Sequence, residues 1–494
     1  MNPERQNGNF APSSPVCYMS IRIIGFTPMR LLICLFLCAL SAGATTSISV
    51  ADFGSKPGAA ELHAHVITEL GKNRSFQLVS DPAQADATLA GTGEIWVKGH
   101  VSLNPRNRTA NDAETLYSGY LSVELKDKGG VTLWSWLATP HSASGNAPRD
   151  LAKVVVSRLT DAVTARSATA PQASPGGIHA SLHGAGATFP QPVYLKWFES
   201  LQHSLPGVTV RYDAVGSEAG IDQLSKGLLD FAASDALISQ ADYFKGGKPK
   251  YLRFPTVLGA VVPIFHLTGM NRDLRFTPEI LAGIYLGTIR RWNDPLLRAA
   301  NPNAALPDHE ITVVHRSDGS GTSYVFTDYL SKVSPPWKTV AGASSSPKWP
   351  VGQGAEGNDG VARRVRELPD SIGYVEYLYA ITNHLSYGVV RNRSGRFVSP
   401  ELDSISAAAD GASNRIAEDF QTSLTDAPRA DAYPIAAFSW FVVPASVEDS
   451  AKKEALKQLL NWILGPGQKQ AAALGYVSIS PDLLSRELRA LEAF

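Results

Sequence analysis

Apolar residues follow two different periods along the chain, and the change of period predicts which segments are strands and which are helices. Between residues 46 and 165, a two-residue period predicts strands at 48–53, 76–79, 87–101, 116–125 and 131–137. Spacings of three and four residues predict a helix over 59–70 and a closing helix whose apolar face carries Leu151, Val154, Val155, Leu159 and Val163. The pattern predicts a small α+β domain over residues 46–165, in which the last three strands form an antiparallel meander.

A segment without apolar periodicity separates this region from the rest of the chain. Residues 166–177 consist mainly of Ala, Pro, Ser, Thr and Gly, a composition typical of a linker. Beyond it, strand and helix patterns alternate through most of residues 181–494, as expected of an α/β fold with a largely parallel sheet. We therefore expect a linker over 166–180 and a second folded unit over 181–494.

Three glycine-containing turns in the second unit each precede a predicted helix. They span 184–190, 214–220 and 316–322, and strands at 208–212 and 311–314 precede the last two. Apolar residues at helical spacing mark the helices that follow: Tyr194, Trp197, Phe198 and Leu201; Ile221, Leu224 and Leu228; Phe326, Tyr329, Leu330 and Val333.

These turns carry the groups that an anion site needs. The start of a helix has unpaired N–H groups and a partial positive charge, and glycine lets a ligand approach the backbone closely. Hydroxyls at Thr188, Ser217, Ser320 and Thr322 would either cap the helices or bind an oxyanion. Capping alone explains any one turn, but three turns, one of them with Arg316, favour an anion site. The P-loop pattern is absent.

Glycine spacing also argues against a dinucleotide site. The pair in Gly184-Ala-Gly186 lacks a third glycine at dinucleotide spacing and a strong predicted strand before it.

Charge and cysteine content narrow the class of protein. The chain has 45 Lys and Arg and 45 Asp and Glu, so its formal net charge is zero. Nucleic-acid-binding domains usually have a basic excess, so this balance argues against nucleic acid as a partner but not against a small anion. The three cysteines, Cys17, Cys34 and Cys38, precede residue 40, which excludes a disulfide framework or a thiolate metal site in the rest of the chain.

The N-terminus has the pattern of an export signal. Arg22 and Arg30 precede an apolar run over 31–40, and small residues over 41–44 predict cleavage after Ala44. The run is shorter than the roughly 20 residues that span a bilayer, although a retained membrane anchor is the alternative. We expect residues 1–44 to direct the protein to the periplasm.

The second unit resembles the periplasmic phosphate-binding proteins of ABC phosphate importers, the PstS type. The matching segments occur in the family's order and cover about 180–480. They are Gly184–Pro190, Asp230–Asp235, Phe254–Thr256, Ile284–Gly287, Trp292–Asp294, Arg316–Ser323, Gly357–Gly360 and Ile372–Tyr377.

The resemblance implies a two-lobed type II periplasmic binding protein fold, α/β in class, preceded here by the small α+β domain. Lobe one would comprise about 181–256 and 433–494, and lobe two about 257–432. One dehydrated inorganic phosphate would be held between the lobes and delivered to a membrane ABC phosphate permease. The resemblance implies a monomer without a cofactor, a bound metal or catalytic residues.

The resemblance also implies which groups hold the anion. Thr188 would donate its hydroxyl, Phe189 its backbone N–H and Ser217 a second hydroxyl. Arg316 would make the charged contact, with Asp318 orienting its guanidinium.

The third turn and one carboxylate would complete the site. Ser320, Gly321 and Thr322 would supply hydroxyl and backbone donors, and Asp235 would accept a hydrogen bond from the ligand. Phosphate near neutral pH carries a proton and sulfate does not, so Asp235 would select phosphate by penalising sulfate. One departure from the family is Glu218, where a negative charge is added beside the second turn; we expect it to point to solvent.

Two other functions stay open. A phosphatase on the same fold would need a metal or an activated nucleophile, and His183, His309 and His315 lie near the motifs but without ligand spacing. Alternatively, the additional domain would make the protein an envelope phosphate sensor or adaptor.

Overall fold

The computed structural model describes residues 46–102, 113–140, 143–164, 179–237, 251–268, 273–411, 416 and 420–494. The predicted export signal, which contains the three cysteines, lies outside these residues, as does nearly all of the predicted linker. Residues 46–494 form one compact unit. Within the described ranges, every helix is too short or too polar to cross a membrane.

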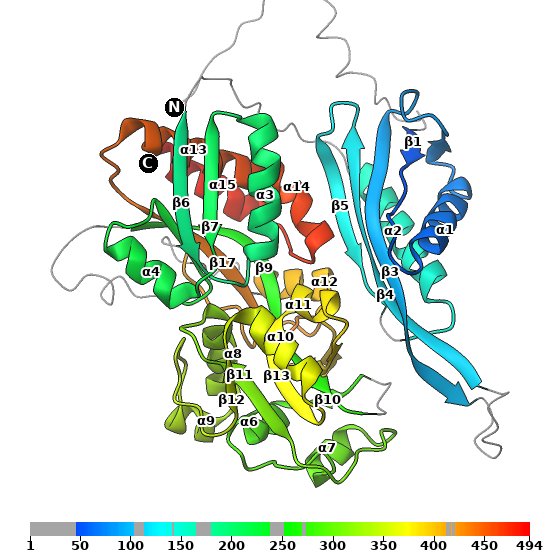
Figure 1. Cartoon of the computed structure of the whole chain (residues 1–494), viewed down its shortest axis with the longest axis vertical. Helices are drawn as coiled ribbons and strands as arrows, with labels where there is room; N and C mark the ends of the chain where they lie inside the picture. The colour runs from blue at the N-terminus through cyan, green and yellow to red at the C-terminus, as the bar shows by residue number, and fades with distance from the viewer. Residues whose placement is uncertain are drawn as a thin grey trace, which may run out of the picture. The chain divides into compact units, whose positions relative to one another are not determined.

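The N-terminal part combines a sheet with two helices. Its five strands, in the order β2-β1-β3-β4-β5, are β1 (Thr46–Val50), β2 (Phe76–Leu78), β3 (Ala87–Ser102), β4 (Ala113–Asp127) and β5 (Thr132–Ala138). β3, β4 and β5 form an antiparallel meander, and β1 runs parallel to both neighbours. The helices, α1 (Ala59–Gly71) and α2 (Ala147–Thr164), cover one face of this sheet (Figure 1).

Apolar alternation explains this arrangement. Leu121, Val123 and Leu125 of β4 are buried in one core with Leu62 of α1 and Val155 of α2. The intervening residues of the strand face the other way. The core between sheet and helices therefore uses only every second residue of the meander.

The second part is built on a nine-stranded mixed sheet, with β14 (Ser386–Tyr387) paired to β9 off its main path. That path runs β12 (Gln353–Ala355), β11 (Thr312–Arg316), β13 (Ser371–Glu376), β9 (Tyr251–His266), β17 (Ala436–Pro444), β8 (Phe231–Ser234), β6 (Ala180–Gly186) and β7 (Val208–Asp213).

Strand β9 joins the two halves of this sheet. Residues 251–260 pair with β17, and residues 261–266 pair with β13. We call the half on the β17 side lobe one and the half on the β13 side lobe two. Pairing is parallel at the two ends of the sheet and antiparallel around β9 and β17. The expected parallel sheet is therefore interrupted at the centre, where β9 runs from one lobe into the other and β17 pairs antiparallel to both of its neighbours.

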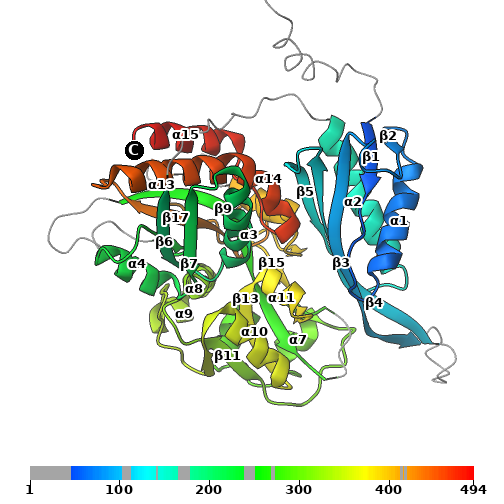
Figure 2. The ribbon, with the colours of Figure 1, turned by 45° about the horizontal axis from the view of Figure 1, so that its top comes forward.

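Helices cover both lobes. Those of lobe one are α3 (Gln191–Ser204), α4 (Ser217–Ser225), α13 (Ser450–Trp462), α14 (Gln468–Ala471), η4 (Ala472–Leu474) and α15 (Pro481–Glu492), with a π-helical turn η3 (Ile463–Gly467). Figure 2 shows α13 beside β6 and α15 on the outer side of α13, so the C-terminal segment returns to the strand that begins the unit.

Lobe two has its own helices and a small sheet. The helices are α6 (Pro278–Tyr285), α7 (Pro295–Ala300), α8 (Gly321–Val333), α9 (Pro335–Val340), α10 (Gly357–Glu367), α11 (Tyr377–Thr382) and α12 (Leu402–Asp410). The sheet contains β10 (Arg275–Phe276), β15 (Val389–Arg391) and β16 (Phe397–Val398).

Two local predictions were wrong. Leu228 is 64% exposed and lies beyond α4, which ends at Ser225 before Gly227 adopts a φ of 71°. Gly184 and Gly186 belong to strand β6, although no strong strand was predicted there. A Cβ at Gly184 would lie 2.1 Å from the Phe231 ring, so small residues replace the usual strand formers because β6 packs tightly on β8.

Candidate functional site

The starts of α4 and α8 meet where the two lobes touch. α4 begins at Ser217 after Gly216, whose φ is 92°, and α8 begins at Gly321 after Ser320. A Cβ at Gly321 would lie 2.3 Å from Ser217 Oγ and 2.5 Å from Asp235 Oδ2, so glycine is required for this approach. Ser320 Oγ accepts a hydrogen bond from the Ser323 N–H at 3.1 Å and caps α8. The second and third predicted turns therefore face one another across the lobes.

Arg316 supplies the positive charge at this place. It ends β11, and its side chain is only 1% exposed. Its Nε donates to Asp318 Oδ1 at 2.7 Å, and its Nη2 donates to Asp318 Oδ2. Burial alone would raise the pKa of Asp318, but the hydrogen bonds and charge of Arg316, with the Gly357 N–H, hold that pKa below its usual value. The two hydrogen bonds fix the plane of the guanidinium.

One nitrogen of Arg316 remains available. Nη1 is buried and has no hydrogen-bond partner within the described residues. A buried cationic donor without a partner is costly, which suggests that an acceptor from outside the chain completes it.

Asp235 places a carboxylate opposite this arginine. It follows β8, is 2% exposed, and its Oδ1 accepts a hydrogen bond from Ser439 Oγ at 2.7 Å. Its backbone N–H donates to Ser217 Oγ at 3.3 Å. Oδ2 is buried without a partner among the described residues. Burial raises the pKa of Asp235 to about 7, although Ser439, Arg316 and Ser217 oppose that increase.

Asn358 joins the remaining predicted hydroxyls. Its Nδ2 donates to Thr188 Oγ1 at 2.9 Å and lies 3.2 Å from Thr322 Oγ1, and its Oδ1 accepts the Glu376 N–H at 3.1 Å. Asn358 is fully buried at the start of α10. Sequence reasoning matched the Gly357–Gly360 motif without giving Asn358 a role; a buried amide between two hydroxyls from different lobes fixes both of them.

Phe189 is the remaining predicted donor. Its ring is buried, and its carbonyl accepts a hydrogen bond from Tyr476 OH at 2.6 Å. Phe189 lies two residues before the start of α3, and the neighbouring Thr188 carbonyl accepts from Tyr379 OH at 2.7 Å. These two tyrosines, from different lobes, hold the first turn in place.

Glu218 lies at the rim of the site and bridges the lobes. Its Oε2 accepts hydrogen bonds from Ser345 Oγ at 3.0 Å and Ser346 Oγ at 2.6 Å, and its N–H donates to Gly319 O at 3.0 Å. The residue is exposed, but its carboxylate contacts lobe two. The sequence pattern gave no sign of this contact, because Ser345 lies 127 residues away along the chain.

The three histidines near the motifs have other partners. His183 Nε2 lies 2.8 Å from Asp213 Oδ2, and His309 Nδ1 lies 3.1 Å from Asp370 Oδ2. His315 stacks on Trp349 with ring centroids 4.8 Å apart. In the part of the chain that the structure describes, no three His, Cys, Asp or Glu side chains come together as a metal site would require.

Comparison with known proteins agrees with this architecture. A family model described as a PBP superfamily domain matches residues 162–466, which is more than half of the chain. A phosphate-binding protein PstS of Xylella fastidiosa strain Temecula1 is 38% identical over 321 residues, 65% of this chain and 87% of that protein. PstS of Haemophilus influenzae is 39% identical over 306 residues, 62% of this chain and 90% of the relative.

A solved structure shares the fold. A high affinity periplasmic phosphate-binding protein, PfluDING, bound with phosphate, superposes with a TM-score of 0.52 at 20% identity, covering 63% of this chain and 93% of that chain. The two-lobed sheet, the order of its motifs and the identity with curated relatives lead to one assignment: this chain belongs to the PstS family of phosphate-binding proteins, within the PBP superfamily, and has the type II periplasmic binding protein fold.

Proposed function

We propose that this protein binds inorganic phosphate between its lobes and delivers it to a membrane ABC phosphate permease. One observation carries the proposal: Arg316 Nη1, a donor, and Asp235 Oδ2, an acceptor, are both buried without partners among the described residues at the junction of the lobes. A ligand that satisfies both must accept hydrogen bonds as an anion and also donate one. A protonated tetrahedral oxyanion has these properties.

The surrounding groups fit the same ligand. Thr188, Ser217 and Thr322 have hydroxyls at this junction, and the first turns of α4 and α8 contribute backbone N–H groups and positive helix ends. Relatives with 38% and 39% identity are phosphate-binding proteins, which supports phosphate as the anion.

Transport is the role that follows from a site of this kind. The proposed ligands of phosphate act by hydrogen bonds and charge, and the nearby histidines are held by groups outside the site, so we propose binding without catalysis. A monomer exported by residues 1–44 to the periplasm would release phosphate when the lobes separate about β9.

Calorimetric titration of the ligand-free protein tests the proposal. Phosphate should bind with 1:1 stoichiometry near neutral pH, and sulfate should not compete. Phosphate binding that is unaffected when Arg316 is changed to Met would show that the anion binds elsewhere. Absence of phosphate binding would refute the proposal and favour another protonated oxyanion or a structural role for the motif.

A further inference from the structure

The N-terminal sheet has a second buried face. Tyr120 of β4 and Leu137 of β5 point away from α1 and α2 and belong to the apolar core of the two-lobed part. Trp96 of β3 packs against the same core. Although the family model begins only at residue 162, the sheet that precedes it is docked on the family domain.

The first set of docking contacts is with lobe one. Ser135 Oγ donates to Lys469 O at 2.6 Å and accepts the Ala473 N–H at 3.1 Å. Ser122 Oγ donates to Ala473 O at 2.8 Å. Ser135 is 3% exposed, and the hydrogen bonds that join β4 and β5 to α14 and η4 are buried or partly buried.

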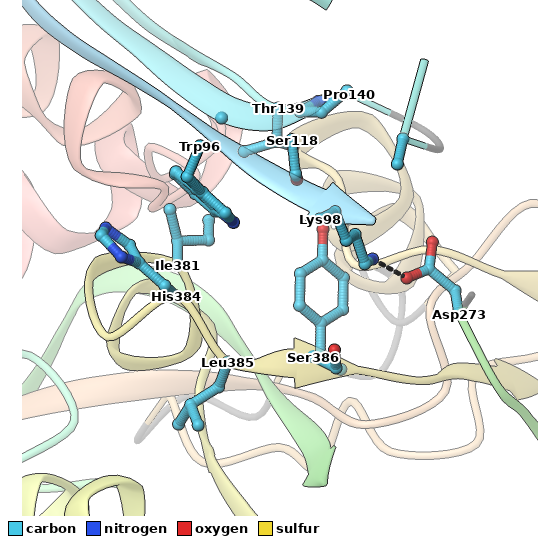
Figure 3. Close-up of a pocket in the computed structure, with 13 residues that line it drawn as sticks. Trp96, Lys98, Ser118, Thr139, Pro140, Asp273, Ile381, His384, Leu385 and Ser386 are labelled. Atoms are coloured by element: carbon cyan, nitrogen blue, oxygen red, sulfur yellow. Dashed lines mark hydrogen bonds and ion pairs between the residues drawn. The ribbon is translucent and has the colours of Figure 1, made fainter. Parts of the chain in front are cut away.

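The second set of contacts is with lobe two, and Figure 3 shows it. Lys98 Nζ lies 2.5 Å from Asp273 Oδ1. The Trp96 ring stacks on His384 with centroids 4.2 Å apart, and His384 Nε2 lies 3.2 Å from Glu94 Oε1. Farther along, Thr139 Oγ1 and Tyr377 OH are 2.8 Å apart.

The two sets of contacts differ in packing. A cleft remains on the lobe-two side, bordered by Trp96, Lys98, Asp273, His384 and Ser386 (Figure 3). Lys98 and His384 are also partly exposed, whereas Ser135 and Leu137 on the lobe-one side are buried. The contacts with lobe two are therefore the weaker set, since they are more exposed to solvent and less tightly packed.

The lobes are closed in this structure. Asn358 joins Thr188 of lobe one to Thr322 of lobe two, and Glu218 of lobe one contacts Ser345 of lobe two. A domain that is fixed to both lobes can satisfy both sets of contacts at only one separation of the lobes. If the lobes open about β9, one set must break, and the weaker set is the one with lobe two.

We propose that docking of the N-terminal domain on lobe two is coupled to phosphate binding, so that the domain reports whether the site is occupied. This inference rests on the proposed function. Phosphate stabilises the closed lobes and thereby the docked domain, and the docked domain strengthens phosphate binding by the same factor, because linkage between two sites is reciprocal. The protein thus has an output, the docked or released state of its N-terminal domain, in addition to a ligand to deliver.

Cross-linking of the full chain measures the docked state directly. A carbodiimide joins an amine to a carboxylate only when the two are in contact, so it should couple Lys98 to Asp273. Yield of this cross-link, determined by mass spectrometry, should rise when inorganic phosphate is added and should not respond to sulfate. Lys452 and Asp230, 2.9 Å apart within lobe one, provide the internal control, whose yield should stay constant.

A variant tests the reciprocal effect. His384→Asn removes the stack on Trp96 and the contact with Glu94, while Asn tolerates the φ of 55° at this position. It should weaken phosphate affinity about fivefold, the lower end of typical couplings. Val97→Ala is the matched control: Val97 is 54% exposed on the same strand as Trp96, and its loss should leave affinity unchanged.

The outcomes separate this inference from the proposed function. If phosphate binds but changes neither the Lys98–Asp273 yield nor the affinity of His384→Asn relative to the unmodified chain, the domain is not coupled to the site. If calorimetry detects no phosphate binding at all, the proposed function fails, and the coupling fails with it.

Discussion

Asp235 and Asp318 are two carboxylates on opposite sides of the lobe junction, and they differ in what Arg316 does for them. Asp318 accepts two hydrogen bonds from the guanidinium and one from the Gly357 N–H, and its pKa is lowered. Asp235 has only Ser439 and Ser217 as close partners among the described residues, so burial raises its pKa to about 7. The same arginine is a structural partner for one carboxylate and a distant charge for the other.

The difference distinguishes a carboxylate that positions a neighbouring side chain from one that is available to a ligand. A carboxylate whose hydrogen bonds are satisfied inside the protein fixes a neighbour. A carboxylate with an unsatisfied oxygen is destabilising until a ligand donates to it. Changes at Arg316, Asp235 and Asp318 either remove this difference or make it measurable, and a change at Glu218 tests the rim beside it.

Removing Arg316 has the largest expected effect. Arg316→Met leaves the half-buried Asp318 without its cation, which should destabilise the protein by roughly 3–5 kcal/mol and weaken phosphate binding at least about 30-fold. Chemical denaturation and calorimetry measure the two effects. Arg364→Met, on the exposed side of α10, is the control and should change neither. Unaltered stability would mean that Asp318 does not depend on Arg316.

The pH dependence of stability distinguishes the two carboxylates next. A folded pKa of about 7 against an ordinary 3.8 means that ionised Asp235 destabilises the ligand-free protein as pH rises between these values. The free energy of unfolding of Asp235→Asn, relative to that of the unmodified protein, should therefore be higher at pH 8 than at pH 5 by about 2–3 kcal/mol. Denaturation at both pH values measures the gain.

The pairing of Asp318 with Arg316 predicts that stability changes with pH in the opposite direction, and in a lower pH range. Its lowered pKa stabilises the protein above the unfolded value, and that contribution is lost only as pH falls below about 3.8. Asp318→Asn should therefore show a constant deficit from pH 5 to pH 8. A deficit that changes across this range would contradict the assigned pairing with Arg316.

Anion selectivity is the third test. Asp235→Asn removes the acceptor for the ligand's proton and adds a donor, so phosphate affinity should fall and sulfate affinity should rise, each by about 1–3 kcal/mol. Competition calorimetry gives both values. Asp318→Asn should weaken the two anions in parallel, because it changes only the orientation of Arg316. Equal selectivity in the two variants would remove the distinction drawn above.

Glu218 gives the smallest effect. It is exposed and contacts Ser345 and Ser346 across the rim, and exposed contacts of this kind contribute about 0.2–1 kcal/mol. Glu218→Ala should therefore speed phosphate release by less than about fivefold. Glu218→Gln, which retains an acceptor, should have a smaller effect in stopped-flow release. Slower release in the alanine variant would show that repulsion of the anion outweighs closure of the lobes.

The proximity of several predicted site residues could be anticipated from the sequence, whereas their role in binding stays a prediction. Glycines beside Ser217 and Ser320 mark helix starts, and the family resemblance brought Thr188, Asp235 and Arg316 together. The bridge through Asn358 was not predictable from spacing. Asn358 lies 170 residues from Thr188 and 36 residues from Thr322 along the chain. Hydrogen bonds of this kind depend on tertiary packing rather than on any local period.

The N-terminal domain shows the same limit. Alternation along β4 and β5 predicted the meander, and one buried face follows directly from it. That Tyr120 and Leu137 on the opposite face belong to a different core could not be predicted, since a period of two residues shows that two faces exist but not what covers them. The prediction that Leu228 belongs to a helix was wrong for the complementary reason. Its spacing is helical, but the residue is exposed because the chain leaves the helix before Gly227.

The position of β17 between β8 and β9 sets the order in which the protein can fold. β17 comprises Ala436–Pro444, near the end of the chain, yet it separates two strands that are synthesised much earlier. Until it is made, β8 and β9 each keep an open edge, and such edges favour aggregation. Sheet closure by so distant a segment is slow, because a long loop must be ordered first. Pairing at the centre of the sheet is therefore completed only after residues 436–444 have been synthesised, when most of the chain already exists.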